Sequence, residues 1–193
     1  MSTLIANTLQ GINTIKYDAN TTAMTIDSSG RVDTQFSKFI CQGFVLTSGQ
    51  SGDQNPLTGW GRYETTLSGD GAGHINNGGD ISISGGIFSY PTTGLYRIEF
   101  FATFAGGSTD STIQYSIDTT QDNSGYSNLA QVKDHTYGSG YKGHVVMVAL
   151  QKVTDISLDK FKFVSTSFGG HTTEGSSTEA LTYFFVTRLG NAS

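Results

Sequence analysis

The segment Phe88 to Phe100 reads Phe-Ser-Tyr-Pro-Thr-Thr-Gly-Leu-Tyr-Arg-Ile-Glu-Phe, and it decides the fold. Apolar and polar side chains alternate from Tyr96 to Phe104, which predicts a strand with one buried face. Pro91 fixes φ at a turn before this strand, and Gly94 marks a position where a side chain would clash or φ would be positive. The predicted buried face consists of Tyr96, Ile98, Phe100, Ala102 and Phe104. We therefore expect a turn that leads into a long central strand, and we assign these residues architectural rather than chemical roles.

The composition of the whole chain agrees with a β-fold. Charged residues make up 14% of the 193 residues, and 25 residues are glycine; an average globular chain has about 25% charged residues. The polar positions hold mostly Ser, Thr, Gly and Asn, which favour strands and turns over helices. A second alternating segment would bury Ile113, Tyr115 and Ile117 on one face.

Ten short strands separated by glycine-rich turns are expected in the larger part of the chain. The candidates are residues 39–46, 61–67, 80–83, 87–90, 95–104, 112–118, 127–132, 144–150, 155–164 and 180–188. Strands of this length and spacing predict a sandwich or jelly roll. We therefore expect one all-β head domain over residues 37–193.

Residues 1–36 differ from this head. Their apolar residues are sparse among Asn, Thr and Ser, and residues 25–32 indicate a tight β-hairpin in which Asp27 and Gly30 favour the turn. So few apolar groups cannot offset the ordering entropy of such a segment alone. We expect a short extended arm that becomes ordered only against copies of itself or against a partner.

Charge and hydropathy exclude several classes of protein. A net charge of −5 and a pI near 5.2 argue against a nucleic-acid partner, which requires clustered Lys and Arg. The beginning of the chain shows no signal peptide, and the longest apolar stretch, around residues 145–150, is too short to span a bilayer. We therefore expect synthesis in the cytoplasm, release other than by ordinary secretion, and no membrane insertion. Cys41, the one cysteine, is expected to be a buried strand thiol.

The segment that opens this section resembles the signature of the complement q-subunit globular head, a branch of the tumour-necrosis-factor-like jelly-roll family. The shared pattern is Phe-x-x-Pro-x-x-Gly-x-Tyr-x-aromatic-x-aromatic, and Ile98 replaces one of its aromatic residues. It is carried here by Phe88, Pro91, Gly94, Tyr96 and Phe100. Residues 77–79, 150–158 and 181–186 are similar, more weakly, to the flanking motifs of the family. The resemblance implies a ten-stranded jelly roll that forms compact homotrimers and serves in binding rather than catalysis.

The beginning of the chain carries a second resemblance. Residues 23–32, Ala-Met-Thr-Ile-Asp-Ser-Ser-Gly-Arg-Val, look like the opening of fibre-type proteins of bacteriophages. The chain also lacks the Gly-X-Y collagen stalk that animal members of the family carry. The resemblance implies a virion surface protein: a trimeric adhesin of tail-fibre or receptor-binding type, joined to other virion proteins by its arm. The alternative is a capsid decoration, or cement, protein whose arm grips the shell. A cellular ligand of the complement or cytokine kind is a weaker rival, because no secretion signal is present.

Loop residues supply the candidate receptor contacts of this adhesin. They are tyrosines and histidines amid Gly and Ser: Tyr126, His135, Tyr137, Tyr141 and His171. Exposed tyrosines beside small polar residues suit the recognition of a glycan or protein on the host surface. The alternative is that some of them cover the edge of the core.

No catalytic site is expected. The four histidines lack metal-binding spacing, and neither a nucleophile elbow nor a phosphate-binding loop occurs. The acidic segment with Asp118, Asp122 and Asn123 resembles a calcium loop only in part, because the EF-hand spacing and its terminal Glu are missing. Calcium therefore stays open as the one candidate cofactor, and we expect no enzyme activity.

Overall fold

The computed structural model describes residues 14–16, 22–26, 32–34, 40–63, 76–77, 80–107, 111–167 and 170–192. The chain divides into two compact units, Met1–Lys38 and Phe39–Ser193. The second unit is called the head below. Within the described residues, no helix is long and apolar enough to cross a membrane.

The first unit contains a three-stranded antiparallel sheet in the order β1-β2-β3. Its strands are β1 (Thr14–Lys16), β2 (Thr22–Ile26) and β3 (Val32–Thr34). Ile26 pairs with Val32 at the ends of β2 and β3, where the hairpin is predicted; the predicted turn, residues 27–31, lies outside the described residues. An anchoring role for this unit stays a prediction.

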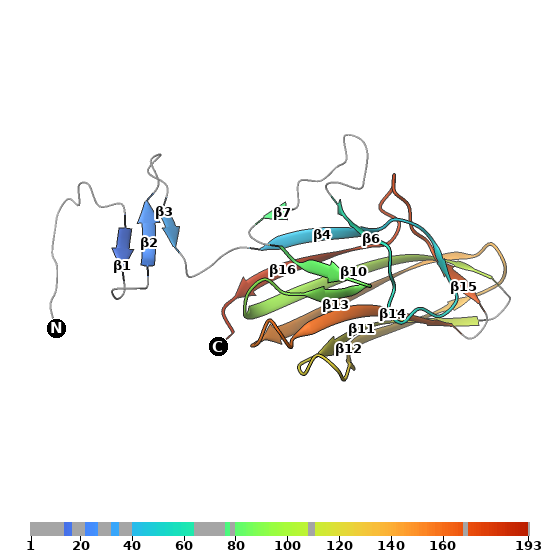
Figure 1. The fold of residues 1–193 in the computed structure, drawn as a ribbon. Coiled ribbons are helices and arrows are strands. Elements are labelled where there is room, and N and C mark those ends of the chain that lie inside the picture. The colour runs from blue at the N-terminus through green and yellow to red at the C-terminus, as the bar shows by residue number, and fades with distance from the viewer. Residues whose placement is uncertain are drawn as a thin grey trace. The chain divides into compact units, whose positions relative to one another are not determined.

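The head is a sandwich of two antiparallel sheets, as predicted (Figure 1). The larger sheet has the order β5-β15-β10-β16-β4-β6, with β13 paired to the other edge of β10 and β7 paired to β4. Its strands are β4 (Cys41–Leu46), β5 (Gln50–Ser51), β6 (Trp60–Arg62), β7 (Asn76–Asn77), β10 (Gly94–Gly106), β13 (Lys142–Val153), β15 (His171–Thr173) and β16 (Tyr183–Gly190). The smaller sheet has the order β12-β11-β14-β9-β8. Its strands are β8 (Ser82–Ser84), β9 (Ile87–Ser89), β11 (Ser111–Thr120), β12 (Ser127–Thr136) and β14 (Lys160–Ser167).

Each of the ten expected strands has a counterpart in the head, although β6 ends at Arg62 and residues 64–67 of the strand expected there lie outside the described residues. The largest error of boundary is in the ninth strand. The strand expected from residue 155 begins only at Lys160, because the preceding residues form a tight turn. The Asp159 carboxylate accepts the backbone N–H groups of Thr154 at 2.6 Å and Asp155 at 2.9 Å. The short strands β5, β7 and β15 lie in segments that we had expected to be turns.

The core between the two sheets is largely aromatic. Both faces predicted from the sequence are buried, which confirms the alternation. They consist of every second residue from 96 to 104 and from 113 to 117. Phe163 stacks on Phe100 with ring centroids 4.4 Å apart, and Phe88 stacks on Phe161 at 4.8 Å. Such contacts add to the free energy of burying the ring surfaces.

The motif residues lie in the core and in the turn that leads into β10. The Tyr96 ring is buried and its hydroxyl donates to the Thr92 carbonyl at 2.8 Å, across the turn that contains Pro91. Burial raises the pKa of this hydroxyl to about 12. A β-carbon at Gly94 would lie 2.6 Å from the Gly190 carbonyl oxygen, so no side chain fits there.

Cys41 corrects one expectation from the sequence. Its thiol is only partly buried, although the following residues of β4 are fully buried. Cys41 pairs with Thr187 at the start of β4, and the Thr187 hydroxyl lies 3.5 Å from the sulfur. Cys41 is the first residue of β4, and its side of the strand is fully covered further along, at Val45.

Candidate binding surfaces

The two ends of the head are formed by different segments of the chain. At one end Ile40, where the chain enters the head, accepts a backbone hydrogen bond from Arg188 in the last strand. The opposite end, called the distal end, gathers the segments around residues 47–59, 106–107, 137–141 and 170–182. These segments are joined by main-chain hydrogen bonds such as Gly106 N–H to Tyr141 O at 2.8 Å and Gly52 N–H to His171 O at 2.8 Å. Figure 1 shows β15 at this end, away from the C-terminus.

Three of the five candidate contact residues come together at the distal end. His135 at the end of β12 packs edge-on against Tyr137 with ring centroids 5.0 Å apart, and Tyr137 packs edge-on against Tyr141 at 5.7 Å. Tyr137 is 73% exposed and Tyr141 is 37% exposed. We call these three residues the aromatic trio. Their rings form a small aromatic surface in contact with solvent.

Local backbone geometry holds the aromatic trio in place. Gly140 has φ of +88°, which favours glycine, and the Tyr141 N–H donates to the Gly138 carbonyl at 3.2 Å. Beside the trio, the Lys142 ammonium pairs with the Glu174 carboxylate at 2.7 Å and so links the start of β13 to the segment after β15. The loop is therefore shaped by its turn and tied to the neighbouring segment.

The other two candidate residues lie elsewhere. Tyr126 stands at the opposite end of β12, where the Lys162 ammonium lies 4.2 Å from the centre of its ring. His171 belongs to β15 and is only 3% exposed. It cannot contact a receptor in this conformation, because the residue is enclosed between the sheets.

The solvent-facing side of the larger sheet is a second candidate surface, which sequence reasoning did not assign. Six apolar side chains of β10, β13 and β16 share this side, and we call them the apolar outer face: Phe101, Val146, Val148, Leu150, Tyr183 and Phe185. Val146, Val148 and Leu150 are each more than half exposed. Val146, Phe101 and Tyr183 form one row across the three strands. Phe101 and Tyr183 stack with centroids 4.7 Å apart.

A glycine makes room for one ring of this face. A β-carbon at Gly43 in β4 would lie 2.8 Å from the Phe185 ring, so the ring rests directly on the backbone of β4. Between the apolar residues, Arg97 and Glu99 pair at 2.6 Å. The sequence did carry a signal for the face, because residues 145–150 are all apolar, as expected for a strand that is covered on both sides.

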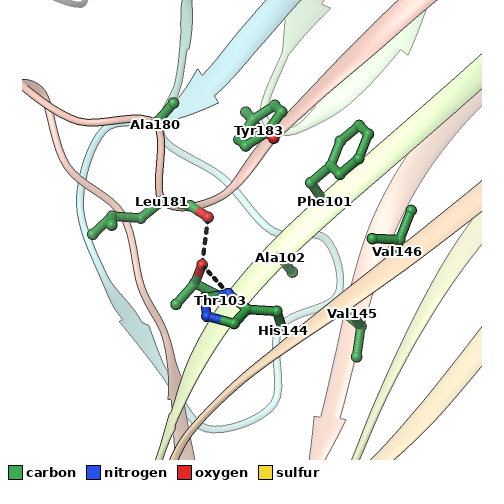
Figure 2. Close-up of a pocket in the computed structure, with 9 residues that line it drawn as sticks. All are labelled: Phe101, Ala102, Thr103, His144, Val145, Val146, Ala180, Leu181 and Tyr183. Carbon is green, nitrogen blue, oxygen red and sulfur yellow. Dashed lines mark hydrogen bonds between the residues drawn. The ribbon is translucent and has the colours of Figure 1, made fainter.

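A hollow of about 310 Å³ lies at the distal edge of the apolar outer face (Figure 2). Phe101, Val146 and Tyr183 contribute apolar walls, and Thr103 and His144 contribute polar atoms. The Thr103 hydroxyl donates to the Leu181 carbonyl at 2.7 Å, so it accepts from His144 Nδ1 at 3.0 Å. This arrangement leaves His144 Nε2 as a hydrogen-bond acceptor when the imidazole is neutral.

The acidic loop considered for calcium is organised by its own hydrogen bonds. The Asp122 carboxylate accepts from the Thr120 hydroxyl at 2.7 Å and from the backbone N–H groups of Ser124 and Gly125 at 2.9 and 2.8 Å. These bonds hold the pKa of Asp122 well below its usual range. Asn123 adopts φ of +59° and accepts from the Lys160 ammonium. Among the residues that the structure describes, no three His, Cys, Asp or Glu side chains are grouped to hold a metal ion.

Comparison with known proteins identifies the fold. The sequence matches no family model and no curated protein. The structure is similar to the tumour-necrosis-factor protein Eiger of S. frugiperda, with a TM-score of 0.59 and 16% identity over 81% of this chain and 96% of that one. It is also similar to murine APRIL at pH 5.0, with a TM-score of 0.57 and 12% identity over 79% of this chain and the whole of that one.

The head is therefore a tumour-necrosis-factor-like jelly roll, as the resemblance of residues 88–100 implied. Identities this low establish the fold and leave the function to be argued from the surfaces of the head itself.

Proposed function

We propose that this protein is a homotrimeric, non-enzymatic surface protein of a bacteriophage virion, an adhesin of tail-fibre or receptor-binding type. The observation that carries the proposal is the apolar outer face. Three of its six residues, Val146, Val148 and Leu150, are more than half exposed in a single head, and an exposed apolar surface of this kind marks a protein contact. The partner that we propose for this face is a second copy of the chain.

Ring closure favours a trimer over an open chain of copies. When a contact joins two different surfaces of the same protein, each copy is rotated relative to the next. The copies form a closed ring when a whole number of these rotations completes a full turn. Strands β12 and β13 lie side by side at one flank of the sandwich, next to the apolar outer face, so the neighbour in such a ring would bury Val146, Val148 and Leu150. Rings of three are the assembly that the family resemblance implies.

Adhesion is supported by the positions of the chain ends and the aromatic trio. The chain enters the head beside Arg188, at the end opposite to Tyr137 and Tyr141. An arm attached to a virion would leave the distal end directed away from the attachment point of the head. Tyrosine offers flat apolar area with a polar tip, which suits contact with a glycan or protein of the host.

Capsid decoration is the second candidate. It is favoured by the small three-stranded sheet of the first unit. Within the described residues, its outer strands β1 and β3 each pair along one edge, with β2. The other edge of β1 or β3 could pair with a strand of a shell protein. Both candidates assign the arm to the particle, and they differ in the task of the head.

Two measurements test the proposal. Light scattering of the full chain should give three times the chain mass of 20.6 kDa, and a monomer at micromolar concentration would contradict the trimer. A version that begins at residue 37 should fold and form trimers but fail to join particles. Its normal incorporation would show that the head does the anchoring. Labelled protein at the tail would indicate an adhesin, whereas label spread over the capsid would indicate decoration.

A further inference from the structure

The side chain of His171 is enclosed without a hydrogen-bond partner. It is 3% exposed, and neither of its ring nitrogens has a partner among the described residues. A neutral imidazole always has one donor and one acceptor nitrogen, so both are unsatisfied here. A native protein satisfies most buried polar atoms, so this exception requires a physical explanation.

The surroundings of His171 are built by a strap that joins the two sheets. Residues 50–54, called the strap, pair with β15 through Gln50 and Ser51, and with β14 of the smaller sheet through Gln54. The Gly52 N–H donates to the His171 carbonyl at 2.8 Å, and Gln54 exchanges two backbone hydrogen bonds of 2.9 Å with Ser165. The strap therefore fixes β15 against the smaller sheet.

Few charged groups can stabilise an imidazolium at this position. The Tyr115 ring of β11 meets the imidazole edge-on at 6.2 Å, and its hydroxyl is engaged with the Thr173 hydroxyl at 2.9 Å. The Asp53 carboxylate on the strap raises the pKa of His171, but burial lowers it by more, and the net direction is downward. Glu174, the next acidic residue along this segment, pairs with Lys142.

We propose that proton uptake by His171 opens the strap and β15 in mild acid, while the remainder of the sandwich stays closed. The charged imidazole cannot be hydrated inside, and opening exposes it to water. Strand β15 is a suitable point of opening, because it has three residues, paired with the last residues of β10 on one side and with the strap on the other. This pH-dependent opening goes beyond the proposed function and requires no particular receptor.

The direction of the pH dependence follows from the two states. The open segment has an ordinary histidine pKa of about 6.5, and the closed one has a lower pKa. The contribution of His171 to closure is complete above about pH 6.5 and is lost as the pH falls toward the lower value. The pKa values of Asp122 and Asp155 are lowered by their turns, so these carboxylates remain ionised across this window.

Opening would also reach the aromatic trio. Glu174 follows β15 directly, its N–H donates to the Thr103 carbonyl at 2.8 Å, and its carboxylate pairs with Lys142 next to Tyr141. Release of β15 would remove this tie from the loop that carries Tyr137 and Tyr141. Mild acid should therefore loosen the distal end before it unfolds the head.

Hydrogen exchange of the full chain at pH 7.5 and pH 5.0, corrected for intrinsic rates, tests the proposal. Peptides that cover residues 50–54 and 170–174 should exchange faster at pH 5.0, by up to about tenfold for each unit below pH 6.5, while residues 96–102 stay protected. H171F, which keeps a ring but cannot titrate, should lose this acceleration. H144Q, at an exposed histidine, should retain it.

Two outcomes would contradict the proposed opening. One is an equal corrected exchange rate of the strap at both pH values in the natural protein, and the other is the same acid-induced acceleration of exchange in H171F. If H171F does not fold, an NMR titration of the natural protein decides instead. The His171 ring should titrate below the ordinary histidine range, together with line broadening of strap amides. Ordinary titration with an unchanged strap would refute the proposal.

Discussion

On the inner face of the larger sheet, Tyr96, Ile98 and Phe100 of β10 are fully buried beneath the smaller sheet. On the outer face of the same sheet, Val146 and Val148 are half exposed although they are equally apolar. One set of side chains is covered by its own chain, and the other remains in water in a single head. Under the proposed trimer, the inner face is covered by folding of the chain itself and the outer face by a neighbouring copy.

The largest effect is expected on the inner face. Tyr96→Ala should lower the free energy of unfolding by about 3–5 kcal/mol, because it removes a fully buried ring from a packed core. Tyr96→Phe keeps the ring and loses the hydrogen bond to Thr92, so it should cost about 1 kcal/mol. Urea unfolding at fixed protein concentration measures both. Equal stability of Tyr96→Ala and the natural protein would show that the assignment of the faces is reversed.

The outer face should respond in assembly and hardly in folding. Val148→Lys places an ammonium next to Glu99, its partner in the sheet, so the single head should change in stability by at most about 0.5 kcal/mol. Burying that charge between copies should weaken the trimer about 100-fold. Sedimentation velocity across a dilution series measures this change.

The matched control for Val148→Lys is Ile156→Lys. Ile156 is similarly exposed at 45%, and it lies in the turn before β14, away from the apolar outer face. This variant should remain trimeric. Dissociation by both variants, or by neither, would remove the outer face as the assembly surface.

A glycine at the entrance to β10 should give an intermediate effect. Gly94→Ala brings a β-carbon to 2.6 Å from the Gly190 carbonyl oxygen, so β10 or β16 must shift. We expect a loss of about 1–3 kcal/mol, read from the urea midpoint. Gly125→Ala is the control, because a β-carbon there meets only the Asp122 carboxylate at 3.6 Å or more. A neutral Gly94→Ala would show that the motif glycine is not required by packing.

The smallest effect on stability is expected at the aromatic trio. Tyr137→Ala should change the free energy of unfolding by less than about 0.5 kcal/mol, because the residue is 73% exposed. It should nevertheless reduce binding to host cells at least about tenfold if the trio holds the receptor. Tyr126→Ala, at the other end of β12, should leave binding unchanged. Equal binding by the natural protein and both variants would show that the aromatic trio does not bind the host.

The sequence predicted the parts of the fold that depend on side-chain alternation. The inward face of β10 and the motif from Phe88 to Phe100 could be identified because period and turn residues are local properties. Strands β5 and β15 could not, since two or three residues become a strand only through pairing with distant backbone. His171 was misassigned for this reason: its neighbours Gly170 and Thr172 suggest a loop, and its burial depends on β10 and the strap.

The candidate surfaces show the same limit. The members of the aromatic trio lie within seven residues of sequence, so a single loop could bring them together. The apolar outer face requires three strands in register, and only the register of β10 with β13 and β16 reveals it. Sequence reasoning therefore found the local surface and missed the one assembled from distant strands.

The hydrogen bond between Ile40 and Arg188 has a practical consequence for labelling. Because the first strand of the head begins beside the end of the last strand, a fluorescent protein or affinity peptide fused after the last residue would project from the end opposite the distal loops. Such a fusion should report the location of the protein on a particle without covering Tyr137. The same closeness means that, in a head that begins near residue 40, a short peptide could join that end to the last strand, and new termini could be opened in the exposed turn after β11.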